Sequence, residues 1–544
     1  MKSSRYAVLL CLLGAVLGTL TPIKAQDSSP ESPSIPPEVE QYASDWPLPN
    51  HDYANTRANF DAEIDSSNVD TLEPAWFFDI PGVAAFGGAA SNPLILGERV
   101  IFQDLTSNVF ALDLQTGDVI WEHIYDLPVL GPNGPAVGYG KVFAIASVDE
   151  FAALDLETGE EIWNRSTGER PTGAFQPTVF GDIAYMTTQA GLGGYGDVVY
   201  RDYEGGSSGH IFALDQETGE TIWDFQVVEE GFWGNPEVNS GGGIWYPPGI
   251  DVETGMTFWA TGNPAPFPGT VEFPNGTSRP GPNLYTNSIL AFDRGGEMVW
   301  YYQAKPHDLF DLDFQIPPIL TSIEANGEDQ AIVIGSGKLG RVVALDRATG
   351  EVLWDTPVGR HENDELDELP LGEVVMVFPG IQGGVETPMA YADGVVYAPV
   401  VNRGTPYTAT GWDAETGGEA VARAEARTDF ESAVSELVAI DVSNGEILWS
   451  TQFDGSAFGG ATIVNDLVFT SSIEGIIRAM SRDDGEIIWE YQAPGGIIAW
   501  PAVTGDTILF PVGIGDQPVL MALRLANDSQ DPGDAATPVP TPWG

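Results

Sequence analysis

One short pattern recurs seven times along the chain. Each copy begins with a small residue and an apolar residue, which an Asp follows in most copies. A turn with Gly comes next, and a Trp lies on the outgoing segment. In the first copy Asp113 precedes Gly117 and Trp121, and the copies end at Trp121, Trp163, Trp223, Trp300, Trp354, Trp449 and Trp489. Because one such unit cannot bury its own apolar face, a repeat of this length predicts a radial or linear repeat architecture.

Each copy is typical of a β-hairpin. The alternation of small and apolar residues before the Asp favours a strand, and the Gly supplies the positive φ that a tight turn requires. The Ile-Trp or Leu-Trp pair then resumes an extended segment. We expect the Trp to pack between neighbouring sheets with its indole N–H on a fixed acceptor.

An eighth, partial copy precedes the others at Ala75-Trp76-Phe77-Phe78. Its partner strands would come from 508–525, so that the two ends of the chain close one blade. The sequence therefore predicts an all-β fold, an eight-bladed β-propeller with Trp-docking repeats, whose closure leaves short and protected sheet edges. Seven blades would result if Trp76 belonged to a lead-in strand.

The termini differ from this central region. The first residues carry Lys2, Arg5 and an apolar run too short to span a membrane, which is typical of a secretory signal peptide. Cys11, the one cysteine, lies inside it, so the mature chain would have no thiol. We expect a periplasmic or secreted protein without a membrane span, with a signal peptide at 1–25, a flexible linker at 26–43, the propeller at 44–526 and a disordered tail at 527–544.

The chain is strongly acidic, with a formal net charge of −57 from 22 basic and 79 acidic residues. This charge argues against binding to nucleic acid or to an anionic membrane surface. Because the acidic residues are dispersed, adaptation of the surface for solubility or high salt explains them, and steering of a basic partner protein is the functional alternative.

The spacing of the Trp residues indicates where function is located. Trp121 and Trp163 are 42 residues apart, and Trp449 and Trp489 are 40 apart, but the intervals between Trp163 and Trp449 are 60, 77, 54 and 95. Extra residues in a propeller emerge as loops, where binding and catalysis are usually located.

Three polar clusters lie in these long intervals: 204–209, 261–266 and 306–313. They contain Glu204, Asn263, Asp311 and Asp313, whose carboxylate and amide oxygens suit Ca²⁺ or a similar hard cation. Each cluster alone is also compatible with a solvated loop or a turn.

Together, the repeat and four motifs resemble the pyrroloquinoline quinone (PQQ) dependent alcohol dehydrogenases from Trp46 to about Gly515. The motifs are Glu204-x-Gly206-x-x-Gly209, Gly242 to Trp245, Thr261-Gly262-Asn263-Pro264, and His307-Asp308-x-Phe310-Asp311-x-Asp313. The register is also similar, since Glu204 precedes Asp215 by eleven residues and Lys338 precedes Asp346 by eight.

The resemblance implies a role for each matching residue. Glu204, Asn263 and Asp311 would bind the metal beside the quinone, and Asp311 would also be the general base. Trp245 would form the floor under the cofactor, and Lys338 would bond the quinone oxygens. The metal would be Ca²⁺, or a lanthanide because Asp313 is an additional possible ligand.

The sequence departs from the family at several cofactor positions. Where the family often has Glu, Arg and Thr, this chain has Ala90, Asn133 and Ala174, and the family's adjacent cysteine pair is absent. We expect Glu386, in place of Asn, and Phe458, in place of Trp, to contact the cofactor.

The resemblance implies a PQQ-dependent dehydrogenase that oxidises a primary alcohol or polyol by hydride transfer to the quinone. No CxxCH motif is present, so a separate cytochrome c would accept the electrons. Two alternatives remain. One is a non-catalytic PQQ-repeat scaffold of the outer-membrane assembly type, which lacks the metal-binding residues. The other is a dehydrogenase for a sugar or a polymeric alcohol.

Overall fold

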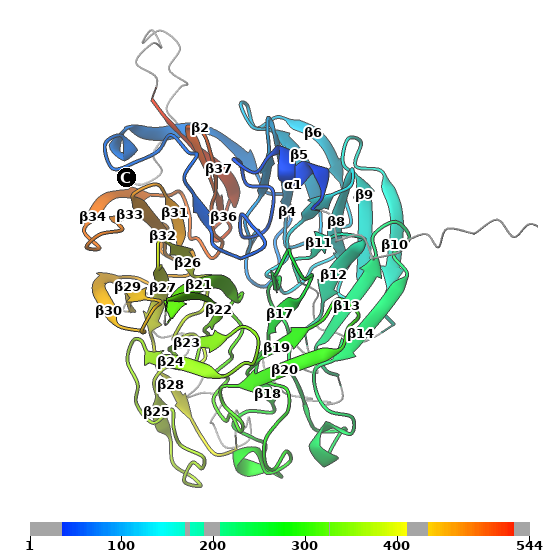
Figure 1. Cartoon of the computed structure of the whole chain (residues 1–544), viewed down its shortest axis with the longest axis vertical. Coiled ribbons are helices and arrows are strands. Elements are labelled where there is room, and N and C mark those ends of the chain that lie inside the picture. Colours follow the sequence, from blue (N-terminus) through cyan, green and yellow to red (C-terminus); the bar gives the residue numbers. More distant parts are fainter. Residues whose placement is uncertain (1–34, 169–174, 190–206, 326, 411–432, 527–544) are drawn as a thin grey trace, which may run out of the picture. The chain divides into compact units, whose positions relative to one another are not determined.

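Eight four-stranded antiparallel sheets, the blades, follow one another around a central axis (Figure 1). The structure is a computed structural model and describes residues 35–168, 175–189, 207–325, 327–410 and 433–526. In this part of the chain no helix is long and apolar enough to cross a membrane.

The first four blades in chain order contain the strands β3 (Leu94–Leu96), β4 (Arg99–Gln103), β5 (Val109–Asp113) and β6 (Val119–His123); β7 (Ala136–Gly138), β8 (Lys141–Ser147), β9 (Glu150–Asp155) and β10 (Glu161–Ser166); β11 (Thr178–Phe180), β12 (Ile183–Thr187), β13 (His210–Asp215) and β14 (Thr221–Gln226); and β16 (Gly249–Ile250), β17 (Thr257–Ala260), β19 (Ser288–Phe292) and β20 (Met298–Gln303).

The other four blades contain β21 (Ile319–Ala325), β22 (Glu328–Gly335), β23 (Arg341–Asp346) and β24 (Val352–Pro357); β26 (Ala390–Ala392), β27 (Val395–Asn402), β29 (Val434–Asp441) and β30 (Ile447–Asp454); β31 (Thr462–Val464), β32 (Leu467–Ser471), β33 (Ile476–Ser481) and β34 (Ile487–Gln492); and β35 (Ala502–Thr504), β36 (Thr507–Val512) and β37 (Val519–Leu525) with β2 (Leu72–Asp79).

Short elements connect or flank the blades. A fifth strand, β1 (Ala58–Asn59), pairs parallel with β31. Two-stranded sheets form between β15 (Ser240–Gly241) and β18 (Pro264–Ala265) and between β25 (Val375–Val377) and β28 (Thr405–Tyr407). The described helices are α1 (Pro37–Gln41), η1 (Val69–Thr71), η3 (Phe232–Gly234) and η4 (Pro274–Gly276).

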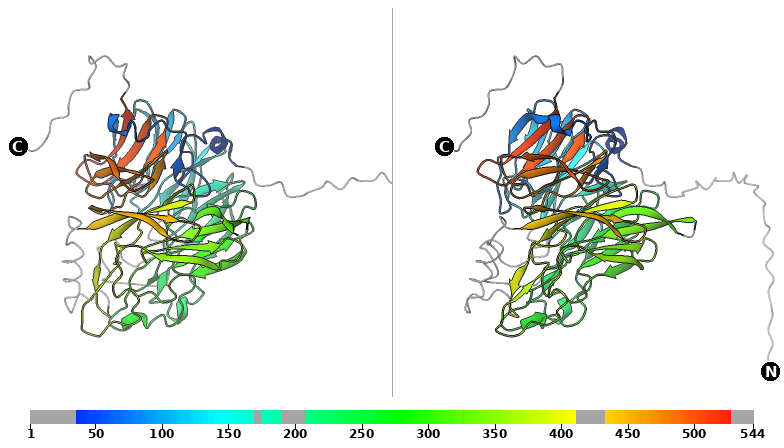
Figure 2. Two further views of the ribbon diagram at one scale, coloured as in Figure 1. Left: turned by 60° about the vertical axis from the view of Figure 1, so that its left-hand side comes forward. Right: turned by 90° about the vertical axis from the view of Figure 1, so that its left-hand side faces the viewer.

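The last blade joins the two ends of the chain. β2 pairs antiparallel with β37, so that Leu72 faces Leu525 and Trp76 faces Ala522. β2 and β37 lie side by side in each view (Figure 1 and Figure 2). Trp76 therefore belongs to a blade, and the prediction of eight blades is confirmed.

Neighbouring blades are joined by the repeated Trp. In seven cases the indole N–H donates to the backbone carbonyl of the residue that follows the repeat Asp or Ser of the next blade. The N···O distances lie between 2.8 and 3.3 Å, for Trp76, Trp121, Trp163, Trp223, Trp300, Trp354 and Trp449. The predicted docking of the Trp between sheets is confirmed.

The Gly of each turn makes room for the ring. Gly159 has φ +70°, and a Cβ there would lie 2.4 Å from the ring of Trp121. The turn itself is closed by Asp155, whose carboxylate accepts from the N–H groups of Glu157 and Thr158. The Asp, Gly and Trp of the repeat are therefore one interaction between two blades.

A buried arginine joins the segment before the first blade to the blade of β31 to β34. Arg57 donates to the carbonyl of Ala461 at 2.8 Å and to the Thr462 hydroxyl at 2.6 Å, and it is fully buried. Its guanidinium lies between the rings of Trp46 and Trp500, at 5.4 and 5.8 Å from their centroids.

Part of the segment expected to be a flexible linker has a defined structure. Within 26–43, α1 packs on the blade of β7 to β10, with Val39 buried. The Glu38 carboxylate accepts from the backbone N–H of Tyr139 at 2.9 Å and of Gly140 at 2.6 Å. The expectation from its Ser, Pro and Glu content is therefore wrong for this part. The signal peptide, residues 26–34 and the tail at 527–544 lie outside the described residues.

We expect Gly159→Ala to destabilise the protein more than Gly140→Ala. Both glycines have positive φ in turns of the same blade, but a Cβ at Gly140 would meet no atom within 4 Å. The difference isolates the contact with Trp121 and should be about 1–3 kcal/mol in the free energy of unfolding, the usual cost of overpacking. Urea denaturation of the two variants measures it. Equal destabilisation would mean that the Gly serves the turn and not the docking.

Candidate active site

Six of the residues singled out in the sequence line one cavity of about 370 Å³: Trp245, Asn263, Asp311, Lys338, Glu386 and Phe458. They come from loops far apart in the chain, and each loop follows directly after a strand. Trp245 lies between β15 and β16, Asn263 between β17 and β18, and Asp311 between β20 and β21. The pairing of β15 with β18 joins the loops of Trp245 and Asn263, and the ring brings the other loops to them.

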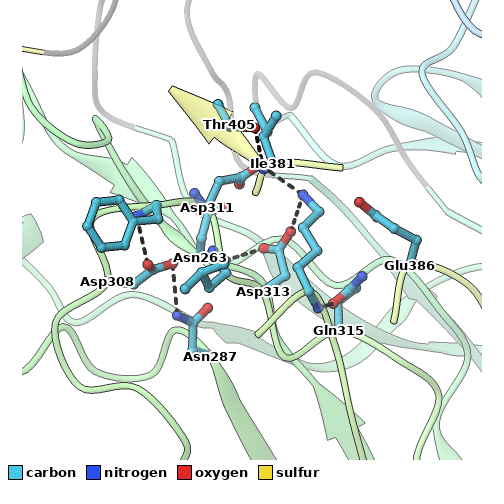
Figure 3. Close-up of polar contacts among 12 residues, drawn as sticks. Asn263, Asn287, Asp308, Asp311, Asp313, Gln315, Ile381, Glu386 and Thr405 are labelled. Carbon is cyan, nitrogen blue, oxygen red and sulfur yellow. Dashed lines mark hydrogen bonds and ion pairs between the residues drawn. The ribbon is translucent and has the colours of Figure 1, made fainter. Parts of the chain in front are cut away.

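Two aspartates and one lysine form the polar centre of the cavity (Figure 3). Lys338 Nζ lies 2.9 Å from Asp311 Oδ2 and 2.6 Å from Asp313 Oδ2. Asp313 Oδ1 accepts from the backbone N–H of Asn263 at 2.6 Å. Asp313 is fully buried behind the cavity wall, whereas Asp311 is 6% exposed and faces the cavity.

Burial determines the protonation equilibria of these groups. It raises the pKa of Asp311 well above its ordinary value and raises that of Asp313, and Lys338 lowers both in return. Burial alone would lower the pKa of Lys338, but the carboxylates of Asp311, Asp313 and Glu386 raise it well above its usual range. A bound cation would favour the ionised carboxylates in the same way.

Glu386 is a third buried carboxyl group near this centre (Figure 3). It is 7% exposed, and burial raises its pKa to about 8, with Lys338 acting in the opposite direction. Among the described residues, no donor bonds its Oε1 atom or the buried Oε1 atom of Gln189, which also lines the cavity. Both oxygens are free acceptors.

The indole of Trp245 forms a flat wall. The ring of Phe175 stacks beside it with a centroid separation of 6.3 Å and an interplanar angle of 24°. Lys338 Nζ lies 4.7 Å from the centroid of Trp245. Much of the remaining wall is apolar, including Phe267, Ile381 and Phe458. The ammonium therefore makes a cation–π contact with the indole, and a flat aromatic ligand on this wall would meet both groups.

The donor set fits a hard cation and a planar quinone. Asn263 and Asp311 on the cavity wall and Asp313 behind it offer oxygen atoms, and Trp245 and Lys338 offer an aromatic surface and a cation. In the part of the chain that the structure describes, no group of three His, Cys, Asp or Glu side chains is placed to hold a metal. Glu204, the third predicted carboxylate ligand, lies outside the described residues.

The three positions that depart from the family pattern do not all lie at the cavity. Ala90 lines the cavity, whereas Asn133 is fully buried and donates to the carbonyl of Asp104 at 2.8 Å. Ala174 lies outside the described residues. Among the described lining residues, Lys338 is the one cationic side chain, so it is the main candidate contact for the carboxylates of PQQ.

Sequence reasoning missed several lining residues. Gln189, Phe267 and Ile381 belong to no motif that we recognised. Phe267 follows Asn263 by four residues, so proximity to the Thr261 to Pro264 motif could have indicated it. Nothing in the sequence indicates Ile381, because its loop reaches the cavity only through the arrangement of the blades in three dimensions.

Comparison with known proteins shows which families this chain resembles. A model described as the glucose/ethanol/alcohol dehydrogenase β-propeller domain matches residues 195–362, and a model described as outer membrane protein assembly factor BamB matches 82–223 and 379–526. The quinohemoprotein alcohol dehydrogenase of Comamonas testosteroni is 26% identical over 91% of this chain and 76% of its own length. The lanthanide-dependent methanol dehydrogenase of Methylorubrum extorquens is 26% identical over 90% of this chain and 89% of its own length.

Solved structures agree on the fold. The crystal structure of the Comamonas testosteroni enzyme matches 90% of this chain and 82% of its own with a TM-score of 0.73 and 23% identity. A europium-containing methanol dehydrogenase matches 88% of this chain and 91% of its own with a TM-score of 0.69 and 20% identity.

Fold and repeat define a propeller built from PQQ-type repeats. Within that class the chain is a divergent relative of the PQQ-dependent alcohol dehydrogenases, which it resembles over most of its length at 26% identity.

Glu386→Gln should make stability less dependent on pH. The carboxyl group keeps its proton up to about pH 8 in the folded chain but loses it near pH 4.5 in the unfolded chain. Its contribution is therefore most favourable below pH 4.5 and is lost as the pH rises to about 8. Removing the ionisable group should raise the free energy of unfolding at pH 8 by about 1–3 kcal/mol relative to pH 5.

Urea denaturation at pH 5 and pH 8 measures this effect, and Glu373→Gln is the control because Glu373 is exposed. The free energy of unfolding of Glu386→Gln could differ between pH 5 and pH 8 by as much as that of the unchanged protein. That result would show that Glu386 ionises in the folded chain as it does in the unfolded chain.

Proposed function

We propose that this protein oxidises a primary alcohol or a related polyol with PQQ and a bound metal ion. The observation that carries the proposal is the convergence of Trp245, Asn263, Asp311 and Lys338 on one cavity, with Asp311 Oδ2 and Lys338 Nζ at 2.9 Å. A scaffold protein would have no need of a buried base and an ammonium facing an aromatic wall, so this arrangement favours the enzyme over the scaffold of the outer-membrane assembly type.

Asp311 is the proposed general base. Its carboxylate lines the cavity and would accept the hydroxyl proton of the substrate. Bound PQQ would supply the acceptor for the hydride of the carbinol carbon, and a bound cation would supply a Lewis acid beside it. Lys338 would hold the quinone oxygens by charge-assisted hydrogen bonds, and Trp245 would orient the ring plane.

Asn263, Asp311, Asp313 and Glu204 are the proposed metal ligands. Ca²⁺ fits their oxygen atoms, and the additional carboxylate of Asp313 favours a trivalent lanthanide. Glu386 and Phe458, which also line the cavity, are the proposed further contacts to the cofactor.

The apolar part of the cavity wall favours alcohols over sugars. Phe267 and Ile381 line the cavity with Asp311, and both are apolar. A sugar would need hydrogen-bond partners for its hydroxyl groups at these positions, since unpaired polar groups are costly when buried. A sugar or polymeric alcohol remains the second candidate for the same chemistry.

A separate cytochrome c is the proposed electron acceptor, because the one cysteine of the chain is Cys11 and no haem attachment motif is present. A basic cytochrome would suit the net charge of −57. The signal-like segment at 1–25 supports a periplasmic or secreted location.

Asp311→Asn should lower kcat for alcohol oxidation by about a thousandfold, because the amide cannot accept the hydroxyl proton. The assay reconstitutes the protein with PQQ and Ca²⁺ or La³⁺ and follows dye reduction by ethanol, 1-butanol, glycerol and glucose. Asp329→Asn, at an exposed position, is the control. Turnover of Asp311→Asn at the rate of the unchanged protein would refute the assignment of the base. Absence of dye reduction by the unchanged protein with either ion would refute the proposed function.

Asp313→Asn should weaken La³⁺ binding more than Ca²⁺ binding. The change removes one negative charge and keeps the shape of a side chain that contacts both Lys338 and Asn263. We expect the ratio of the two dissociation constants to change about tenfold, which corresponds to the loss of one charged ligand. Competition against Tb³⁺, detected by luminescence sensitised by Trp245, measures both constants. An unchanged ratio would exclude Asp313 as a ligand.

A further inference from the structure

Asp311 lies in an unusual turn. The loop between β20 and β21 carries it with φ +61°, in the left-handed region that side chains other than Gly rarely adopt. Such a conformation persists where the surrounding structure determines it, and it is concentrated at functional positions. The direction of the Asp311 carboxylate therefore depends on what fixes the turn.

The carboxylate of Asp308 bonds to the backbone on both sides of Asp311 (Figure 3). Its Oδ1 atom accepts from the N–H of Phe310 at 2.8 Å, and its Oδ2 atom accepts from the N–H of Leu312 at 2.7 Å. Asn287 Nδ2 donates to Oδ2 at 3.2 Å. Asp308 is fully buried and does not line the cavity.

Two further buried side chains hold the same loop from outside. Arg279 Nη2 donates to the backbone carbonyl of Asp308 at 2.6 Å. Tyr407 Oη, from β28, donates to the carbonyl of Phe310 at 2.6 Å. These bonds fix the ends of the turn, whereas those from Asp308 close the turn around Asp311.

We propose that Asp308 is the positioning residue for Asp311: by bonding the amides of Phe310 and Leu312 it holds the left-handed turn that directs the Asp311 carboxylate at Lys338 and the cavity. This inference rests on the proposed function, in which Asp311 is the base. Without the carboxylate of Asp308 the two amides lose their acceptors, and the turn can relax to a conformation with negative φ. The Asp311 oxygens would then leave the cavity.

A similar bonding pattern elsewhere provides a matched control. Asp104 is also fully buried and accepts from the backbone N–H groups of Thr106 at 2.8 Å and Asn108 at 3.0 Å. None of the described residues 104–108 lines the cavity. Asp104→Asn should therefore disturb a loop of the same kind without moving the base.

The experiment compares Asp308→Asn, Asp308→Ala and Asp104→Asn in the full chain reconstituted with PQQ and Ca²⁺ or La³⁺. We expect kcat of Asp308→Asn to fall about 10- to 100-fold with KM changed less than about threefold, because a misplaced base slows the chemical step. The amide keeps one acceptor oxygen, so Asp308→Asn should retain more activity than Asp308→Ala. Asp104→Asn should lower the thermal midpoint by a similar amount but leave kcat within about threefold.

A second measurement does not depend on activity. Hydrogen exchange at the amides of Phe310 and Leu312 should be at least about tenfold faster in Asp308→Ala, because both acceptor oxygens are removed. Exchange unchanged in that variant, or loss of kcat in Asp104→Asn equal to that in Asp308→Asn, would overturn the inference. An inactive unchanged protein would refute the proposed function, and the exchange rates would then decide whether Asp308 fixes the turn.

Discussion

The contact between one Trp and the turn of the next blade is the interaction on which the rest of the structure depends. It combines a hydrogen bond from the indole to a backbone carbonyl with close packing of the ring on a Gly that must have positive φ. Each blade alone exposes an apolar face, and this contact joins it to its neighbour at a fixed distance. These docking bonds fix the fourth, fifth and sixth blades relative to one another, so that their loops meet at one cavity.

The site places several ionisable side chains in the protein interior, where charged groups are unfavourable. Asp311, Asp313 and Glu386 lie around Lys338, and all four are nearly or fully buried. Burying ionised groups costs free energy that a hydrophobic cluster of similar volume would not. The rest of the protein therefore has to supply the stability that this group lacks, which the fully buried inner strands and the repeated docking contacts do.

The sequence alone predicts the frame and several residues that the structure brings together at one cavity, because both depend on local patterns. Trp245, Asn263, Asp311 and Lys338 follow strands at spacings that can be recognised, and their loops converge as expected. Ile381 and Gln189 could not be predicted, since only the three-dimensional closure of the ring brings their loops to the cavity. Composition was misleading for α1, where Val39 and Glu38 find partners on a blade that is distant in sequence. Asp308 stood in a recognised motif, but its role follows from the direction of its oxygens, which a sequence does not contain.

The pairing of β2 with β37 has a consequence for the order of folding. Leu72 faces Leu525, so the strand nearest the beginning of the propeller has its partner near the other end. Contacts of such sequence separation form slowly, because a long chain segment must be closed before they are made. During synthesis β2 would remain unpaired until all other blades have been made, and its exposed edge is open to association with other chains for that time. The dispersed negative charge of the chain would oppose that association through mutual repulsion of the unfinished chains.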